Sequence, residues 1–420
     1  MTIRILVVSQ WYDPEPGSAA QAGVIARALS RRGAHVEVLT GFPNYPTGEL
    51  AGGYRVLPYQ REVLEGITVH RAPLWPSHSS AAASRALNYL SWAAGASAVG
   101  PLKAPLADAV LVHSTPATAA LPALALRATR RIPFVVQVQD LWPQTVTSSD
   151  FLTRGHLSLL ERPLHAMCDA IYRRASAVAI TSPGMAPLIA ARGVPEAKIR
   201  FAANWADEAV FRPVPRDQAL GRKLGLTRPF TFMYAGNFGP YQSLDTVLDA
   251  AEHLRHRADI GIALVGDGVQ GAWLRDEVRR RGLDGVSFVP PVPFSEMTDV
   301  LALGDAHLIS LQDLPLFRTT LPSKLQATLA AGRPIVGAVR GDAAEVIRDS
   351  SAGLVVTPGD AQALSGAIAR LADAGSQRLA AFGEAARGYY LRTFSEETAS
   401  QVLLDLLHEA AGRTRVGSKQ

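Results

Sequence analysis

The chain has 420 residues, of which 48% are hydrophobic, and its 42 basic and 37 acidic residues give a formal net charge of +5. This length is too great for one hydrophobic core and predicts two domains, while the high apolar and low charged content excludes a disordered chain. Cys168 is the single cysteine, which excludes a disulfide framework and a cysteine-based metal site and leads us to expect the reducing cytoplasm.

The basic residues are mostly arginines and are scattered among acidic ones. They favour anionic partners such as nucleotide phosphates, a lipid pyrophosphate or a membrane surface. We expect no nucleic-acid partner, because no recognition motif or platform of aromatic and basic residues is present. The apolar run near the N-terminus is too short for a signal peptide or a membrane-spanning helix, so we expect neither.

The first half of the chain alternates apolar strands with helices. Residues 3–10 form a β-branched strand, a loop with Gly17 follows, and a helix ending at Gly33 leads into a second strand at 35–41. The loop lacks the GxGxxG pattern of dinucleotide sites. It nevertheless follows the first strand at its carboxyl end, where open α/β sheets place ligands.

Further predicted strands of this half are 66–74, 108–114, 133–140, 176–182 and a short one from 198. The strand 133–140 brings Asp140, with Trp142 close behind, to the carboxyl edge of the sheet. A carboxylate at that edge is a candidate catalytic group, and a helix N-cap is the structural alternative.

An apolar stretch at 85–107 is predicted to be a helix, either packed on the sheet or dipping into a membrane surface. Basic residues flank its aromatic and aliphatic side chains. The residues concerned are Arg85, Leu87, Tyr89, Leu90, Trp92 and Lys103.

The second half repeats the alternation, so two doubly wound α/β domains are expected. Its predicted strands are 229–239, 260–268, 286–292, 305–311, 335–339 and 353–360. We place the domains at 1–208 and 209–390, with a C-terminal helix and tail at 391–420 crossing back to the first domain.

The stretch 315–337 contains the strongest local prediction of a binding site. Pro322 and Ser323 open a short helix that ends at Gly332. Free backbone N–H groups, a hydroxyl and the ammonium of Lys324 at a helix start are typical of a phosphate site. An ordinary helix with a surface lysine is the alternative.

Taken in order, the motifs YDPEPG, QDLWP, NWAD, YAGNFG, LVGDG, LPSK and AAGRPIVG resemble family 4 retaining glycosyltransferases. Within that family the chain is similar to bacterial O-antigen and capsule enzymes of the N-acetyl-L-fucosamine transferase type. The resemblance covers nearly the whole chain. It implies a GT-B fold, in which two Rossmann-like domains face each other across a cleft.

The resemblance also implies roles for individual residues. The donor pyrophosphate would meet the loop after the strand at 229 and the start of the 323 helix, and the base would meet the loop after the strand at 286. The donor residues implied are Gly17, Gly236, Asn237, Pro291, Val292, Ser323, Lys324 and Leu325, and Asp140 would face the acceptor or the transferred sugar.

The chain departs from the family at the usual Glu-x7-Glu pair, whose positions hold Thr319 and Ala327. Asn237 and Gln242 replace the usual Arg and Lys. Three interpretations remain: other residues substitute, the nucleotide is bound differently, or the protein is a degenerate partner. We favour the first, with Glu345 reaching the ribose, and Arg318 and Lys324 holding the phosphates.

The expected activity is retaining transfer of a sugar, such as an N-acetylated amino or deoxy sugar, from a nucleotide-sugar, preferably UDP-linked. The acceptor would be a hydroxyl of a glycan or of a polyprenyl-pyrophosphate sugar, with peripheral contact to the inner face of the plasma membrane. No metal or other cofactor is expected, since no DxD motif or metal-ligand spacing is present. The alternatives are an enzyme acting on a small natural product, a nucleotide-sugar 2-epimerase and a non-catalytic partner subunit.

Overall fold

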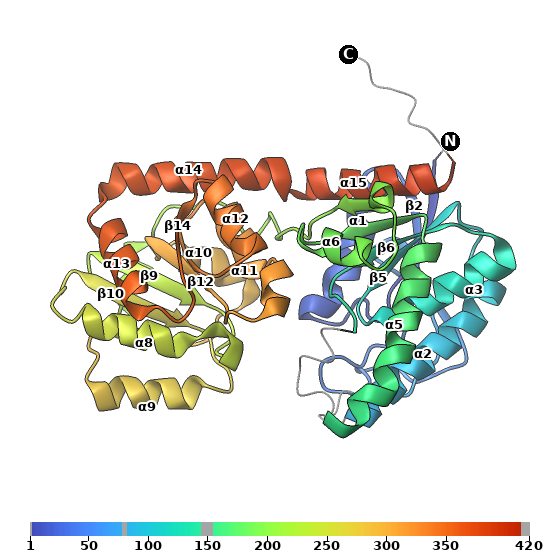
Figure 1. Cartoon of the computed structure of the whole chain (residues 1–420), viewed down its shortest axis with the longest axis horizontal. Helices are drawn as coiled ribbons and strands as arrows, with labels where there is room; N and C mark the ends of the chain where they lie inside the picture. The colour runs from blue at the N-terminus through green and yellow to red at the C-terminus, as the bar shows by residue number, and fades with distance from the viewer. Residues whose placement is uncertain (1, 78–81, 144–153, 413–420) are drawn as a thin grey trace, which may run out of the picture. The chain divides into compact units, whose positions relative to one another are not determined.

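The computed structural model describes residues 2–77, 82–143 and 154–412 of the chain. These residues fall into two compact units (Figure 1). Unit 1 comprises Met1–Ala202 with Ser400–Gln420, and unit 2 comprises Ala203–Ala399.

Unit 1 is built on an eight-stranded sheet. All neighbouring strands are parallel except the first two, which pair as an antiparallel hairpin across Glu65 and Gly66. In order across the sheet, the strands are β3 (Gln60–Leu64), β4 (Ile67–Arg71), β2 (His35–Thr40), β1 (Arg4–Val8), β5 (Ala109–Ser114), β6 (Phe134–Val138), β7 (Ala177–Ile180) and β8 (Ile199–Phe201). The sequence analysis did not predict β3, whose side chains alternate between partly buried and exposed.

The helices of unit 1 cover both faces of its sheet (Figure 1). They are α1 (Gln21–Arg31), α2 (Ala82–Lys103), α3 (Leu121–Arg130), α5 (Arg154–Arg174) and α6 (Met185–Ala190). The main core of the unit joins the apolar side chains of β1, β5 and β6 to those of α2, α3 and α5. Such strands, buried on both faces, explain the continuous apolar runs in the sequence.

Unit 2 has six strands, all parallel, in the order β11 (Val286–Val289), β10 (Ile260–Val265), β9 (Phe230–Ala235), β12 (Ala306–Ser310), β13 (Ile335–Ala338) and β14 (Gly353–Val356). Its helices are α7 (Gln218–Lys223), α8 (Leu244–His253), α9 (Gly271–Arg281), α10 (Met297–Leu301), α11 (Ser323–Ala330), α12 (Asp342–Asp349), α13 (Ala361–Ala372) and α14 (Gly375–Thr393). The predicted pair of doubly wound α/β domains is confirmed.

Each sheet has one point at which the chain reverses its direction of winding. In unit 1 the chain proceeds outward from β1 through β2 and then returns to place β5 on the other side of β1. In unit 2 it proceeds from β9 through β10 and returns to place β12 beside β9. Loops leaving the carboxyl ends of strands diverge at such switch points, which is where open α/β sheets bind ligands.

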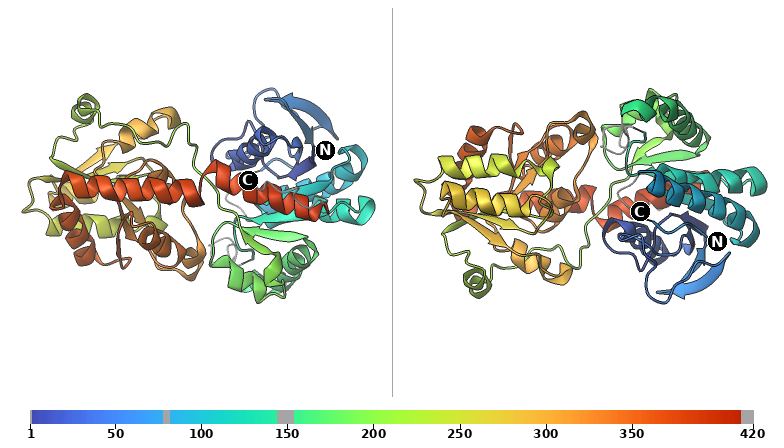
Figure 2. Two further views of the ribbon diagram at one scale, coloured as in Figure 1. Left: turned by 90° about the horizontal axis from the view of Figure 1, so that it is seen from above. Right: turned by 90° about the horizontal axis from the view of Figure 1, so that it is seen from below.

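The last helix, α15 (Glu396–Ala410), begins in unit 2 and belongs to unit 1 from Ser400 onward. There it lies beside α1 (Figure 2). Arg32, just after α1, donates from Nε to Ser400 Oγ at 2.7 Å and from Nη1 to Gln401 Oε1 at 2.6 Å. The expectation of a C-terminal helix is confirmed.

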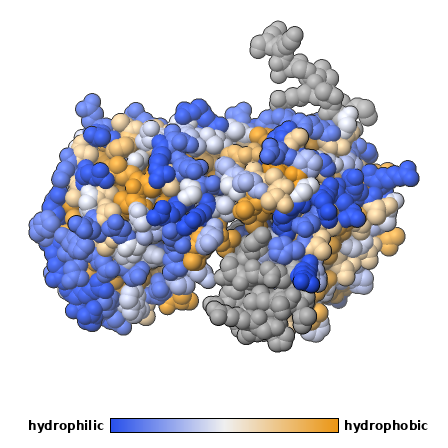
Figure 3. All heavy atoms as spheres, viewed as in Figure 1, coloured by the Kyte–Doolittle hydropathy of each residue, from blue (hydrophilic) through white to orange (hydrophobic). Residues whose placement is uncertain are grey.

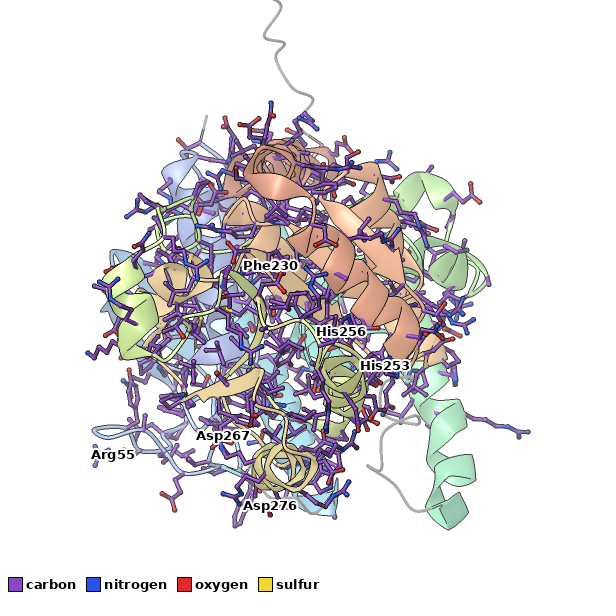
Figure 4. The ribbon with its side chains drawn as sticks, turned by 90° about the vertical axis from the view of Figure 1, so that its left-hand side faces the viewer. Arg55, Phe230, His253, His256, Asp267 and Asp276 are labelled. Atoms are coloured by element: carbon purple, nitrogen blue, oxygen red, sulfur yellow. The ribbon has the colours of Figure 1, made fainter. Side chains whose placement is uncertain are left out.

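Helix α9 presents a charged outer surface in unit 2. Figure 3 shows hydrophilic residues gathered over this helix. Asp276 lies on the helix and Asp267 on the loop before it, both among the surface side chains at this end of the unit (Figure 4). On the inner side, Arg281 pairs with Glu277 and with Asp249 of α8, so ion pairs support the packing of α9 against its neighbour.

Candidate functional site

In unit 2 the loop after β9 is fixed against the loop after β10. Gly236 N–H donates to Val265 O at 2.9 Å, and Phe238 N–H donates to Asp267 O at 2.8 Å. A methyl group added at Gly266 would lie 2.1 Å from the carbonyl oxygen of Gly236. Glycine is therefore required at 266 for two backbones to approach this closely.

Helix α11 opens beside this loop, at the switch point of the sheet. Its N-cap is Pro322, and within the described residues no side chain hydrogen-bonds to the cap. The side chain of Lys324, in the first turn, extends to the β9 loop: a methyl group at Gly236 would lie 2.3 Å from its Cε. The predicted helix start and Lys324 thus lie together with Gly236.

The ammonium of Lys324 has an aromatic environment. It donates a hydrogen bond to the hydroxyl of Tyr234 and lies 4.1 Å from the centroid of that ring. The Tyr234 hydroxyl in turn donates to Asn237 O at 2.7 Å. Burial lowers the pKa of Lys324 to about 8. In the described part of the chain no salt bridge neutralises this cation, so it can serve an anionic ligand.

The remaining predicted residues of unit 2 lie around this point with different partners. Arg318 is paired with Asp313, its Nε 2.9 Å from the carboxylate oxygen, and Asp313 also pairs with Arg340. Glu345 on α12 and Ser323 at the start of α11 are exposed, and Leu325 is fully buried. Pro291 and Val292 follow β11 at the carboxyl edge. An exposed side chain that is already paired is a weaker phosphate ligand than Lys324.

Two side chains replace the basic residues that the family usually carries in this loop. The side-chain amide of Asn237 lies against Gly239 and Gly268: a methyl group at either glycine would lie within 2.8 Å of it. The Gln242 Oε1 atom is buried without a hydrogen-bond partner among the described residues. Neither residue carries charge, and Lys324 brings an ammonium to this loop from α11.

In unit 1, Asp140 lies just beyond β6 and is half-buried. Burial raises the pKa of its carboxyl. Gly17 begins the short 3-10 helix Gly17–Ala20 after the β1 loop and has a φ of +67°. Both residues therefore lie at the carboxyl edge of this sheet, as predicted.

Sequence reasoning missed Glu15, whose carboxylate fastens two loops at the same edge. It accepts hydrogen bonds from the backbone N–H groups of Tyr12 at 3.0 Å, Asn44 at 2.8 Å and Tyr45 at 2.9 Å. Burial raises the pKa of Glu15 to about 7 against the effect of these donors. The motif YDPEPG marked the loop but not this role.

Four aromatic rings also gather at this edge of unit 1. The ring of Trp11 lies 5.1 Å from that of Tyr45 and 6.1 Å from that of Tyr89, and Tyr89 lies 6.4 Å from Trp142. A buried amide network supports them, in which Gln10 donates to Asn88 at 2.6 Å. Trp11 is buried, whereas Tyr45, Tyr89 and Trp142 are partly exposed and can stack on the apolar faces of sugars.

The structure corrects the face of α2 expected to meet a membrane. Trp92 is fully buried in the core and Tyr89 belongs to the aromatic group, so neither is free to enter a bilayer. Leu87 and Leu90 are 49% and 54% exposed. Trp75, 59% exposed, joins them because its backbone bonds to Asn88 and Ser91 of the same helix.

Among the described residues, no helix combines the length and the apolar character that crossing a bilayer requires. The histidine, cysteine and carboxylate side chains of the same residues form no cluster of three or more suited to a metal ion.

The chain matches two families of known proteins. Residues 17–205 match the family described as glycosyl transferase 4-like domain, and residues 229–374 match glycosyl transferases group 1. Together these matches extend over most of both units.

Individual relatives agree with this assignment. WcaI of Escherichia coli K12, named for colanic acid biosynthesis as a glycosyl transferase, is 28% identical over 338 residues, covering 79% of this chain and 82% of WcaI. The glycosyltransferase WbjE of Pseudomonas aeruginosa is 24% identical over 303 residues, covering 69% of this chain and 71% of WbjE.

Solved structures share the fold at low sequence identity. Sucrose-phosphate synthase from Thermosynechococcus elongatus superposes with a TM-score of 0.72 at 18% identity, covering 97% of this chain and 98% of its own. HepE of Anabaena, solved in complex with UDP, superposes with a TM-score of 0.69 at 20% identity, covering 97% of this chain and all of its own.

Proposed function

Because the chain is a glycosyltransferase of the GT-B fold, we propose that it transfers a sugar from a UDP-sugar, with retention of anomeric configuration, to a hydroxyl of a glycan or lipid-linked saccharide. The observation that carries this proposal is the buried, unneutralised ammonium of Lys324 at the switch point of unit 2. The relative named for colanic acid biosynthesis and the UDP bound by HepE support the acceptor class and the donor class.

In this proposal the donor diphosphate lies between the β9 loop and the start of α11. The backbone N–H group of Ser323 is a candidate to meet its oxygens, together with the ammonium of Lys324. The base lies near Pro291 and Val292. Glu345 is our candidate for the ribose hydroxyls, because its carboxylate is exposed on α12. Arg318 would have to exchange Asp313 for a phosphate to take part.

The proposed chemistry needs no nucleophile from the protein. The bond between the sugar's anomeric carbon and the diphosphate oxygen breaks, and the acceptor oxygen bonds to the same face of that carbon. The departing phosphate oxygen takes the acceptor's proton, so charge and atoms balance. Lys324 stabilises the negative charge that develops on the diphosphate, which is the main way in which a fixed cation accelerates such a reaction.

We assign the acceptor to unit 1. Asp140 can hydrogen-bond an acceptor or sugar hydroxyl, and the partly exposed rings of Tyr89 and Trp142 offer apolar faces along the same edge. Accurate placement of the acceptor hydroxyl would be their contribution to the rate.

We further propose that Trp75, Leu87 and Leu90 rest on the membrane surface, which would bring a polyprenyl-pyrophosphate acceptor within reach. The test is flotation with anionic liposomes at low and high salt, comparing wild type with Trp75→Ser/Leu90→Ser. We expect binding that weakens with salt and in the double variant. Protein that never floats would favour a small acceptor in solution and, with it, an enzyme of natural-product type.

The activity itself is tested by incubating the purified protein with a panel of nucleotide-sugars and acceptor glycans and weighing the products by mass spectrometry. Acceptor-dependent release of UDP with a product heavier by one sugar supports the proposal. UDP release and sugar isomerisation without any acceptor would identify an epimerase. Binding of UDP without turnover at any enzyme concentration would identify a partner subunit.

A further inference from the structure

Tyr234 is placed unusually for a residue at the end of a buried strand. Its ring is 1% exposed near the end of β9, yet its hydroxyl contacts both the β9 loop and a side chain from α11. Tyr234 and Lys324 are 90 positions apart in the sequence. The hydroxyl is thus the connection between the two parts of the candidate phosphate site.

The hydrogen bonds at this hydroxyl have a fixed direction. A phenol has one proton, which goes to the carbonyl of Asn237, so the lone pairs are left to accept from the ammonium. An ammonium has three protons, and one of them is used here. Lys324 is therefore held in one orientation with two N–H groups remaining for an anionic ligand.

We propose that Tyr234 is a positioning residue: its ring and hydroxyl aim the Lys324 ammonium at the donor diphosphate. This inference rests on the proposed function, because it assumes that Lys324 binds phosphate. The hydroxyl supplies orientation and the ring supplies a cation–π contact to an otherwise unneutralised charge. Asp313 and Arg318, two charged residues of the segment before α11, are paired with each other.

The test is a double-mutant cycle on UDP affinity, measured by calorimetry with Tyr234→Phe, Lys324→Ala and the combination. The phenylalanine keeps the ring and removes only the hydroxyl. We expect Tyr234→Phe to weaken UDP binding about 3- to 10-fold, in line with the net loss of one ordinary hydrogen bond, because the hydroxyl acts on UDP only through Lys324. In the Lys324→Ala background it should have no further effect, since residues acting through one another are non-additive.

The pH dependence of UDP affinity is a second measurement, which a merely structural defect would not change. Burial raises the pKa of Tyr234 well above its usual range, so it stays a neutral acceptor. Without the Tyr234 hydroxyl the Lys324 ammonium loses a stabilising partner and gives up its proton at a lower pH. As the pH is raised, UDP affinity should therefore begin to fall at a lower pH in Tyr234→Phe than in wild type. The matched control is Tyr241→Phe, at a tyrosine that follows β9 and packs its ring against Phe317. It should change neither the UDP affinity nor its pH dependence.

The outcomes distinguish the positioning role of Tyr234 from the phosphate contact of Lys324. If Tyr234→Phe weakens UDP binding equally with and without Lys324, or leaves affinity and pH profile unchanged, the positioning role is overturned. If Lys324→Ala itself binds UDP as wild type does, the proposed phosphate contact has failed instead.

Discussion

The ammonium of Lys324 is held by a ring and a hydroxyl, with its charge left for a ligand. Lys324→Ala should therefore reduce transfer by roughly 10²- to 10³-fold, the usual effect of removing one group that stabilises developing charge. Steady-state turnover with a UDP-sugar measures this. Lys223→Ala, at an exposed position on α7, is the matched control and should retain full activity. A Lys324→Ala enzyme with more than about a tenth of wild-type activity would contradict the assignment.

Asp140 offers a prediction that separates the two substrates. Asp140→Asn should lower kcat at least ~10-fold while changing donor affinity little, because we place the carboxylate on the acceptor side. A collapse of UDP affinity in calorimetry would instead move Asp140 to the donor site.

The acid limb of activity provides a check on the same carboxylate. Burial raises the pKa of Asp140 above its usual value, so the ionised form is lost at higher pH than for a free aspartate. Wild-type turnover should therefore decline on acidification before pH reaches about 4. The Asp140→Asn enzyme should lack this limb.

At the scale of elements, the β9 loop leads to a prediction about the space that Lys324 occupies beside Gly236. An alanine at Gly236 would place its methyl group against the flexible end of Lys324 and displace the ammonium. Gly236→Ala should therefore weaken UDP binding about as much as Lys324→Ala does. Its φ of +140° also makes alanine strained, so some loss of stability is expected.

Gly225→Ala is the control that separates strain from displacement. Gly225 has a φ of +74° and open space around it. This variant should lose stability in thermal unfolding but bind UDP normally. Normal binding by Gly236→Ala would show that Lys324 does not act from the position seen here.

The sequence predicted these elements well where the determining pattern was local. Apolar runs of strand length indicated a doubly wound sheet in each half, and Pro322, Ser323 and Gly332 marked the bounds of α11 to within two residues. The edge strand β3 lacked such a run and was missed. The prediction that Trp92 belongs to the membrane-facing side of α2 was wrong, since Trp92 is buried. A helix with apolar residues all round does not show in its sequence which side is buried.

Site residues with distant partners were beyond prediction from the sequence. Tyr234 looked like an ordinary strand residue, since its contact with Lys324 closes only when α11 packs beside β9. Glu15 likewise needs the loop after β2 to supply two of its three donors. The positions of Asp140 and Lys324 at the carboxyl edge could be predicted from the sequence, because Asp140 follows a strand and Lys324 opens a helix.

At the scale of the whole molecule, each unit contains a fully buried imidazole. Burial lowers the pKa of His113 in unit 1 to about 4 and that of His307 in unit 2 to about 3. An unfolded histidine takes up a proton near pH 6.5, so the unfolded state binds more protons below that pH. Stability is therefore complete above pH 6.5 and is lost as the pH falls toward these values.

His307→Gln tests this linkage in unit 2. Between pH 7 and pH 5 a single such histidine lowers the free energy of unfolding by up to about 2 kcal/mol. The variant should not show this loss. Urea unfolding at the two pH values measures the difference. His256→Gln, on an exposed residue of the same unit (Figure 4), should keep the wild-type acid sensitivity. Equal acid sensitivity of wild type and His307→Gln would contradict a neutral buried imidazole.

The placement of α15 has a consequence for biosynthesis. Most of unit 1 is translated first, but four buried leucines that it receives from α15 are translated last: Leu403, Leu404, Leu406 and Leu407. While the ribosome is still making unit 2, the nascent first half lacks these leucines and the two side chains of α15 that accept hydrogen bonds from Arg32. A premature stop codon that removes these leucines would therefore damage the half of the protein that was made earliest. Synthesis of α15, rather than completion of the first sheet, is the step that supplies unit 1 with its last helix.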